Sequence, residues 1–384
     1  MEAYFDNSAT TRCSDGVRSL MVRALCEDYG NPSSLHRKGM EGEHYIKEAG
    51  VRIAKTLKAK ESEIIFTSGG TESNNLAILG GAMANRRSGM HLVTTRIEHP
   101  AVAKPMEFLE KQGFSVTYLD VDGDGRISLE QLEESITPET ILVSMMYVNN
   151  EIGAVEPVAE AAERIKKKNP KAIFHVDAIQ AYGKYAIYPA RMGIDLMSVS
   201  GHKIHGPKGS GFLYIGDKVK VLPILHGGGQ QKGLRSGTEN VPGIAGLGQA
   251  AMEAYSQFPE KQAHLYRLKE AFVEGLAGEP WAQFNGRTGQ DGAPHILSLT
   301  VEGVRSEVLL HALEDKQVYV SAGSACSSHK PAPSRTLQAI GLKKEALGST
   351  VRISFCPGNT LGEVGYCLSA LKEIVPMLQR FTRH

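Results

Sequence analysis

Two side chains that are costly to bury follow apolar segments of this sequence. Asp177 comes directly after the segment 172–176, and Lys203 lies just beyond the segment 196–200. A carboxylate or an amine at such a place is expensive to desolvate unless a group of opposite charge or a hydrogen-bond partner meets it. Burial would also lower the pKa of the lysine towards that of a nucleophilic amine. Taken alone, Asp177 could cap a helix and Lys203 could lie on a solvated loop.

A glycine-rich turn supplies a third chemical feature. Ser68-Gly69-Gly70-Thr71 joins an apolar segment to a helical one, so its backbone N–H groups and hydroxyls suit a phosphate, although a helix cap would look similar. Its order matches neither the dinucleotide-binding nor the P-loop motif. Pyridoxal phosphate (PLP) requires all three features, because its aldehyde bonds a lysine, its ring nitrogen pairs with a carboxylate, and its phosphate binds at a helix start. The three together therefore predict a PLP site.

The predicted elements that position these groups indicate an α/β fold. Continuous apolar runs alternate with helical segments such as 72–83, and the predicted strands are 63–67, 90–95, 115–119, 141–148, 172–176, 196–200 and 211–215. Continuous rather than alternating apolar strands indicate a mostly parallel sheet with helices on both faces. Near Pro259 the pattern changes to a charged helix, 259–277, followed by a strand, 296–301, and mixed elements. A domain boundary is therefore expected near 255–260.

Composition excludes several classes of protein. The 384 residues carry 43 Lys+Arg against 42 Asp+Glu, a net charge of +1, which argues against direct nucleic-acid binding or attachment to an anionic membrane. No apolar run approaches the length of a membrane-spanning helix, and the first residues lack the pattern of a secretory signal. Five cysteines are too few for a disulfide framework, and no Cys/His spacing indicates a metal site. A cytoplasmic protein is expected.

One segment resembles part of a calcium-binding loop. Asp120, Asp122 and Asp124 occupy alternate positions before Gly125, as in an EF-hand, but the twelfth position is Gln131 instead of a bidentate glutamate. The segment before it reads as a strand, whereas an EF-hand requires a helix there. The alternative, which we favour, is a turn whose Ser128 caps the following helix. A calcium-binding protein is the non-enzymatic hypothesis.

Motifs along the whole chain resemble one family. The chain is similar to cysteine desulfurases of the NifS/IscS type, which belong to the class-V aminotransferases among fold-type I PLP enzymes. The resemblance rests, in chain order, on the segments 5–11, 30–34, 66–72, 98–99, 149–153, 175–180, 200–203, 235–240, 323–326 and 351–355. It implies a large PLP-binding domain, residues 15–257. A smaller α/β domain, residues 1–14 and 258–384, would carry a catalytic cysteine loop at about 321–334.

The resemblance assigns roles around the cofactor. Lys203 would form the Schiff base and later move the substrate Cα proton, and Asp177 would pair with the ring nitrogen. Gln180 would lie near the phenolic oxygen, and His99 would stack on the ring and serve in proton transfer. The residues implied for the phosphate are Gly70, Thr71, Ser200 and His202.

Three further residues are implied for the partner subunit and the substrate. Thr238 would reach the phosphate of the neighbouring subunit, which implies a homodimer with shared active sites. Asn150 and Arg352 would hold the substrate carboxylate, and Asn150 would also contact the cofactor. A guanidinium is the natural bidentate partner of a carboxylate, and the apolar neighbours of Arg352 argue against a surface ion pair.

Cys326 carries the distinguishing chemistry of the resemblance. It lies among small and polar residues bounded by Pro331 and Pro333, which predicts an exposed, mobile loop, and the neighbouring His329 and Lys330 would favour the thiolate. The implied reaction converts L-cysteine into L-alanine and a Cys326 persulfide. The persulfide would pass to an acceptor, either an iron–sulfur scaffold protein or a tRNA-thiolation enzyme.

Two enzymatic alternatives remain open from the sequence. An aminotransferase would need Lys203 and Asp177 but would have no use for Cys326. A selenocysteine lyase would act on selenocysteine and scarcely on cysteine.

Overall fold

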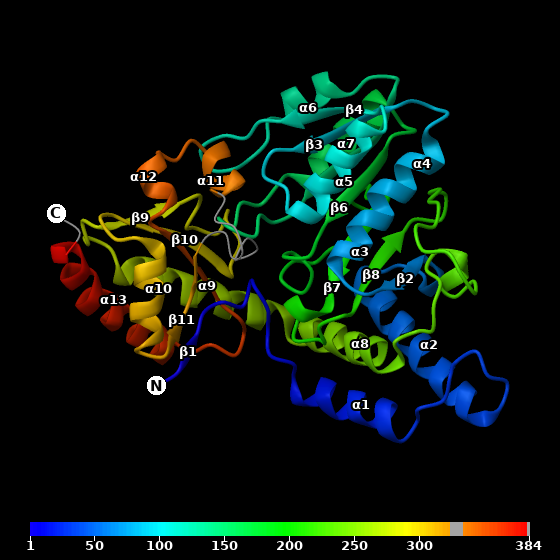
Figure 1. The fold of residues 1–384 in the computed structure, drawn as a ribbon, viewed down its shortest axis with the longest axis horizontal. Coiled ribbons are helices and arrows are strands. Elements are labelled where there is room, and N and C mark those ends of the chain that lie inside the picture. The colour runs from blue at the N-terminus through cyan, green and yellow to red at the C-terminus, as the bar shows by residue number, and fades with distance from the viewer. Residues whose placement is uncertain (323–332, 382–384) are drawn as a thin grey trace.

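The main body of the protein is a seven-stranded sheet, shown in Figure 1 of the computed structural model, which describes residues 1–322 and 333–381. In sheet order the strands are β2 (Ile64–Thr67), β8 (Gly211–Ile215), β7 (Leu196–Ser200), β6 (Ile173–Asp177), β5 (Thr140–Met146), β3 (His91–Thr95) and β4 (Ser115–Leu119). The five strands from β7 to β4 are parallel, whereas β8 is antiparallel to both β7 and β2. A short connection without a crossover helix returns β8 beside β7, which forces the antiparallel direction. The predicted strands and the mostly parallel sheet are confirmed.

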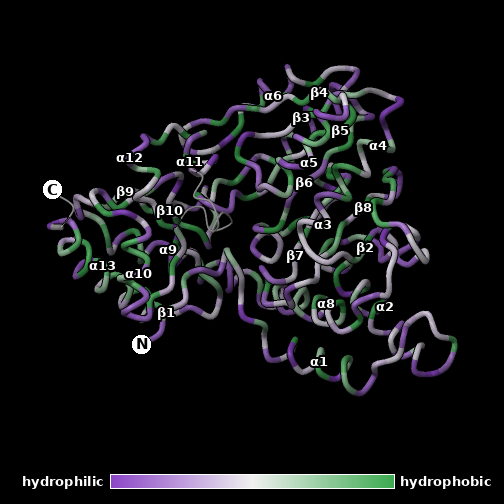
Figure 2. Tube along the Cα trace, in the orientation of Figure 1, coloured by the Kyte–Doolittle hydropathy of each residue, from purple (hydrophilic) through white to green (hydrophobic). Residues whose placement is uncertain are grey.

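Helices cover both faces of this sheet, and alternate strand residues face the two layers. One face packs against α2 (Arg37–Leu57), α6 (Leu129–Ser135), α7 (Val158–Lys168) and α8 (Val241–Tyr255), with α1 (Asp15–Cys26) outside α8. The other packs against α3 (Gly70–Asn75), a π-helical turn (Leu76–Gly80), α4 (Gly81–Asn85) and α5 (Pro100–Lys111). Because both faces are covered, every residue of β5, β6 and β7 is buried, including their polar residues. Figure 2 shows hydrophobic colouring along these inner strands.

A second, smaller core forms around a four-stranded antiparallel sheet. Its order is β12 (Ser321–Ala322), β13 (Thr350–Ser354), β10 (Ile296–Val301) and β9 (Ala282–Asn285), and it packs against α9 (Phe258–Gly275), α10 (Ser306–Glu314) and α13 (Leu361–Phe381). The short helices α11 (Arg335–Ala339) and α12 (Lys344–Leu347) lie beside it (Figure 1). The two cores share no residue. The domain boundaries expected from the sequence stay a prediction.

The N-terminal residues belong to the small core and then cross towards the large sheet. β1 (Ala3–Tyr4) pairs in parallel with β11 (Val318–Tyr319). Residues 5–11, here called the crossing segment, follow: Ser354 N donates to Phe5 O at 2.7 Å, and Thr11 N donates to His202 O at 2.8 Å. The crossing segment therefore ties the small sheet to the turn that carries Lys203. Among the described residues, no helix is both long and apolar enough to cross a membrane.

Candidate active site

The predicted site residues converge on one cavity at the carboxyl ends of the parallel strands. This cavity of about 640 Å³ is lined by the last residues of β5, β6 and β7, where open α/β sheets bind their ligands. Ten predicted residues line it: Gly70, Thr71, His99, Asn150, Asp177, Gln180, Ser200, His202, Lys203 and Arg352. Thr238 is exposed and does not line the cavity. Cys326 lies outside the described residues.

Asp177 ends β6 as a fully enclosed carboxylate. Its Oδ2 accepts a hydrogen bond from Asn74 Nδ2 at 2.7 Å, and its Oδ1 accepts one from Ile179 N at 3.0 Å. Burial raises the pKa of Asp177, although the nearby charges of His99 and Lys203 and the two hydrogen bonds act in the opposite direction. A cationic ligand group against Asp177 would favour the ionised form. The carboxylate is thus held in place for a positive charge.

Lys203 lies at the end of a single 3₁₀ turn, Gly201–Lys203, that follows β7. Its Nζ donates to the backbone oxygens of Ser8 and Ala9 in the crossing segment. Behind it, the buried Lys184 donates from Nζ to the backbone oxygen of Lys203 at 2.6 Å, which fixes the main chain of the turn. The crossing segment therefore sets where the amine lies.

His99 caps the start of α5 and faces the cavity. Its Nδ1 accepts a hydrogen bond from Ala101 N at 3.1 Å, so in the neutral ring the proton is on Nε2. Burial lowers the pKa of His99. A neutral imidazole with a defined tautomer is suited to moving a proton at Nε2.

The glycine-rich turn makes a small cradle above β2 and β7. Gly69 has a φ of 145°, which side chains disfavour, and a Cβ on Gly70 would come within 2.2 Å of Ile179 Cδ1. The helix begins at Gly70, two residues before the predicted start, and continues through the π-helical turn to Asn85. The φ of Gly69 therefore favours glycine here, and the helix start at Gly70 and Thr71 lines the cavity beside Ser200 and His202.

Two more predicted residues hold defined orientations. Gln180 Nε2 donates to Ser8 O at 3.0 Å, which orients its amide. His202 Nδ1 lies 3.2 Å from Thr10 Oγ1, and burial lowers the pKa of His202 to about 4. His202 is therefore neutral near pH 7, so it can contribute a hydrogen bond but no positive charge to an anion.

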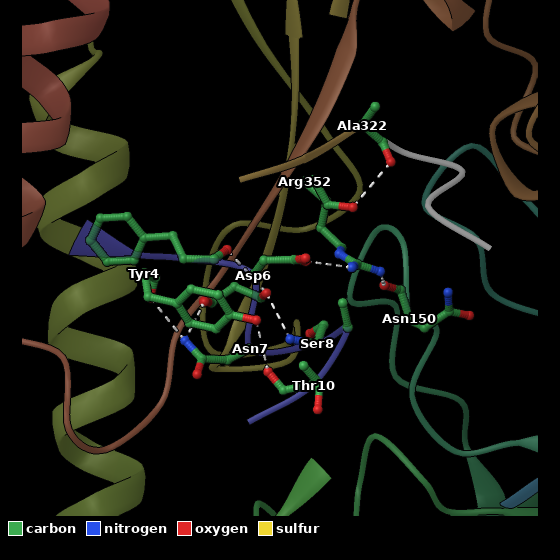
Figure 3. A network of polar contacts seen from close by, with 12 residues as sticks. Tyr4, Asp6, Asn7, Ser8, Thr10, Asn150, Ala322 and Arg352 are labelled. Atoms are coloured by element: carbon green, nitrogen blue, oxygen red, sulfur yellow. Dashed lines mark hydrogen bonds and ion pairs between the residues drawn. The ribbon is translucent and has the colours of Figure 1, made fainter. Parts of the chain in front are cut away.

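Arg352 lies on β13 of the small sheet and also lines the cavity; Figure 3 shows its contacts. Its Nη1 donates to Asn150 O at 2.9 Å, and its Nη2 forms an ion pair of 2.9 Å with Asp6 Oδ1. The guanidinium is almost fully buried, with a side-chain exposure of 6%. Asn150 thus contacts Arg352 through its backbone oxygen, and its side chain remains available for a ligand (Figure 3).

The sequence reasoning missed several residues that shape the site. Asn74 was hidden in a helical segment, although it lies one turn after Thr71. Glu98 accepts from Thr95 Oγ1 at 2.7 Å and from Met146 N at 2.9 Å, and burial raises its pKa to about 8. Its position beside His99 in the family motif was a signal, but no pattern in the sequence predicted that it bridges β3 and β5.

The residues present fit PLP. Asp177 is a buried carboxylate, the left-handed φ of Gly69 favours glycine in the cradle, and the amine of Lys203 lies on the same cavity. A ring nitrogen, a phosphate and an aldehyde are the groups that such a donor set would hold.

Comparisons with known proteins agree with this chemistry. The family model for aminotransferase class-V matches residues 3–366. The cysteine desulfurase IscS of Methanosarcina thermophila is 44% identical over 379 residues, covering 99% of this chain and 93% of that protein. A solved NifS-like protein superposes with a TM-score of 0.93 at 38% identity, covering 98% of this chain and 100% of that one. The structure described as SspA in complex with cysteine has a TM-score of 0.82 at 37% identity, covering 93% and 100%.

The chain therefore belongs to the aminotransferase class-V family, within its NifS/IscS cysteine desulfurases. It is a PLP-dependent enzyme with the fold of that family.

Proposed function

We propose that this enzyme removes sulfur from L-cysteine, giving L-alanine and a persulfide on Cys326 that passes to an acceptor protein. The observation that carries the proposal is the convergence of Lys203, Asp177, His99 and Arg352 on one cavity. An amine, a fixed carboxylate, a neutral imidazole and a guanidinium are the groups needed to bind an amino acid and move its Cα proton.

The cofactor would be held by residues of the large-sheet wall. Asp177 would face the ring nitrogen, His99 the ring, and the Gly70–Thr71 helix start with Ser200 and His202 the phosphate. When bound, PLP supplies an electron sink for negative charge that develops at the substrate Cα. Asp177 would keep the ring nitrogen protonated, because its carboxylate is fixed by Asn74 and Ile179.

The substrate would be oriented by the opposite wall. Arg352 would bind the α-carboxylate, while Lys203 Nζ would move the proton at Cα. His99 would hold or donate a proton from Nε2 near the substrate sulfur, since its Nδ1 is engaged by the backbone of α5. The Cys326 thiolate would attack that sulfur, so that an S–S bond forms as the substrate C–S bond breaks. The remaining carbon fragment takes up protons and leaves as L-alanine.

Assembly and destination of the sulfur are part of the same proposal. Thr238 is exposed and lies away from its own cavity, which supports a role at the neighbouring subunit of a homodimer. The acceptor would be an iron–sulfur scaffold or a tRNA-thiolation enzyme, and the location would be cytoplasmic.

The test is release of sulfide and alanine from L-cysteine in the presence of a thiol reductant. We expect equal amounts of both products from the parent protein. We expect none from Cys326→Ala, although this variant keeps its cofactor absorbance. A variant that released sulfide as fast as the parent would contradict transfer through Cys326 and favour a lyase.

A further inference from the structure

The substrate-binding guanidinium already has a resident carboxylate. Asp6 Oδ1 lies 2.9 Å from Arg352 Nη2, and the Asp6 side chain is 22% exposed against 6% for Arg352 (Figure 3). Asp6 does not line the cavity, so it reaches Arg352 from behind. The charge of Arg352 is therefore balanced before any ligand arrives.

This arrangement leaves part of the guanidinium available. Asn150 O and Asp6 Oδ1 each take one of its N–H groups. Arg352 Nε is buried and has no partner among the described residues. A guanidinium has five N–H donors in a planar fork, so the remaining ones suffice for a second carboxylate. Asp6 therefore shares Arg352 with a ligand and does not block it.

The backbone fixes Asp6 in this position. Asp6 forms a parallel bridge with Ser354, the neighbour of Arg352 two residues along β13. On either side of Asp6, Phe5 O accepts from Ser354 N at 2.7 Å, and Asn7 Nδ2 donates to Ser354 O at 3.0 Å. Asp6 and Arg352 thus lie on paired segments, and this pairing holds the backbone of Asp6 beside the guanidinium.

We propose that Asp6 is a positioning residue that acts through Arg352 and limits the affinity of the site for the α-carboxylate of its amino-acid ligands. Two carboxylates on one guanidinium repel each other, so a resident one weakens the binding of the next. The consequence is that L-alanine leaves readily after sulfur transfer. This inference rests on the proposed function.

The test compares two ligands on the PLP-loaded protein, followed by the change in cofactor absorbance. L-alanine carries the carboxylate, and L-alaninamide is its neutral isostere. We expect Asp6→Asn to lower the Kd for L-alanine about fivefold, the scale of losing one like charge at a partly screened site. The Kd for L-alaninamide should not change. The KM for L-cysteine should fall together with the Kd for L-alanine, while kcat should not rise.

Matched variants separate charge from folding. Asn7→Ala removes the neighbouring, more buried residue of the crossing segment, whose Nδ2 donates to Tyr4 O, Ser354 O and Asn359 Oδ1. Among the described residues, Asn7 forms no hydrogen bond with Arg352. We expect it to lower the melting temperature without changing the ratio of the two affinities. Asp6→Glu retains the charge and should restore the parent ratio. Asp6→Ser, a second neutral variant, should change the ratio in the direction of Asp6→Asn.

The possible outcomes are distinct. An unchanged or weakened affinity of Asp6→Asn for L-alanine, or an equal shift for both ligands, would overturn the inference while leaving the proposed function intact. A parent protein that binds neither ligand and releases no sulfide would overturn both.

Discussion

The two walls of the cavity treat their charged groups in opposite ways. On the large-sheet wall, Asp177 accepts hydrogen bonds from two neutral donors, and burial raises its pKa although the charges of His99 and Lys203 oppose that shift. On the small-sheet wall, Arg352 is equally enclosed but forms a direct ion pair with Asp6. Among the described residues, the carboxylate of the first wall therefore has no ion pair of its own, whereas the guanidinium of the second wall has one. The contrast suits a cofactor that stays bound on one side and a substrate that must exchange on the other.

Loss of Lys203 should have the largest effect on activity. In Lys203→Ala we expect kcat to fall on the order of a thousandfold or more, because the variant would lack both the amine that we propose bonds PLP and the base that we propose for the Cα proton. Melting temperature should change little, because Ser8 and Ala9, whose backbone oxygens accept from Nζ, line the cavity, where water can replace the amine. Steady-state sulfide release and thermal unfolding of the same samples check this. Substantial residual turnover would assign the proton transfer to another group.

Neutralising each wall should have opposite consequences for the protein without PLP. Asp177→Asn should not lower its thermal stability, because Asn74 Oδ1 is buried without a partner and can accept from the new amide after a flip. Asp6→Asn should lower the stability by about 3 kcal/mol, the scale of removing one partner from a buried ion pair, since Arg352 is almost fully buried.

In the PLP-loaded protein, Asp177→Asn should instead reduce kcat about a hundredfold or more, the scale of breaking a buried charge pair. Unfolding curves of both variants, with and without PLP, make the comparison. If both variants destabilise the PLP-free protein alike, the contrast between the walls is wrong.

Two buried glutamates, of which only one lines the cavity, allow an effect on the pH dependence of stability to be separated from an effect on activity. Burial raises the pKa of Glu98, which lines the cavity, and of Glu156, which does not, to about 8 in each case. Each is protonated in the folded chain and ionised in the unfolded chain between pH 4.5 and about 8. Each therefore makes stability fall as pH rises through that window, by up to about 1.4 kcal/mol per unit.

Glu98→Gln and Glu156→Gln should both flatten the decline in stability with pH. Only Glu98→Gln should change activity, because Glu98 aligns Thr95 and Met146 at the rim of the cavity. Urea unfolding at several pH values and kcat at pH 7 are the measurements. An equal loss of activity in both variants would show that the effect is not local to the cavity.

The smallest effect on activity is expected in the segment that resembles a calcium loop, whose residues do not line the cavity. Ser128 Oγ accepts from Gln131 N at 3.1 Å and caps α6, while Asp122 Oδ1 accepts from the N–H groups of Asp124 and Arg126 at 2.9 Å each. The capping turn predicted from the sequence is confirmed. Ser128→Ala should lower the free energy of unfolding by about 1 kcal/mol and leave sulfide release unchanged. A rise in melting temperature on adding calcium would revive the calcium-binding hypothesis.

Much of the large-sheet wall could be predicted from the sequence because its residues follow strands at short range. Asp177, Ser200 and Lys203 each lie at or just beyond the end of an apolar strand, and parallel strand ends meet at one edge of a sheet. The pattern did not reveal Asn74 or Glu98, since each acts on a strand from which it is remote in sequence.

The sequence by itself determined the α/β class, the strand ends that carry the proposed cofactor-binding residues, and the glycine-rich turn before a helix. Those features depend on local periodicity and on the cost of burying charge. Only the tertiary structure placed Asp6 on Arg352 and Ser8 on Lys203. The partners in these pairs are separated by nearly the whole chain or half of it, and their contact depends on how the crossing segment bridges the two cores. No local pattern encodes that path, so charge balance at the substrate wall emerges only with the fold.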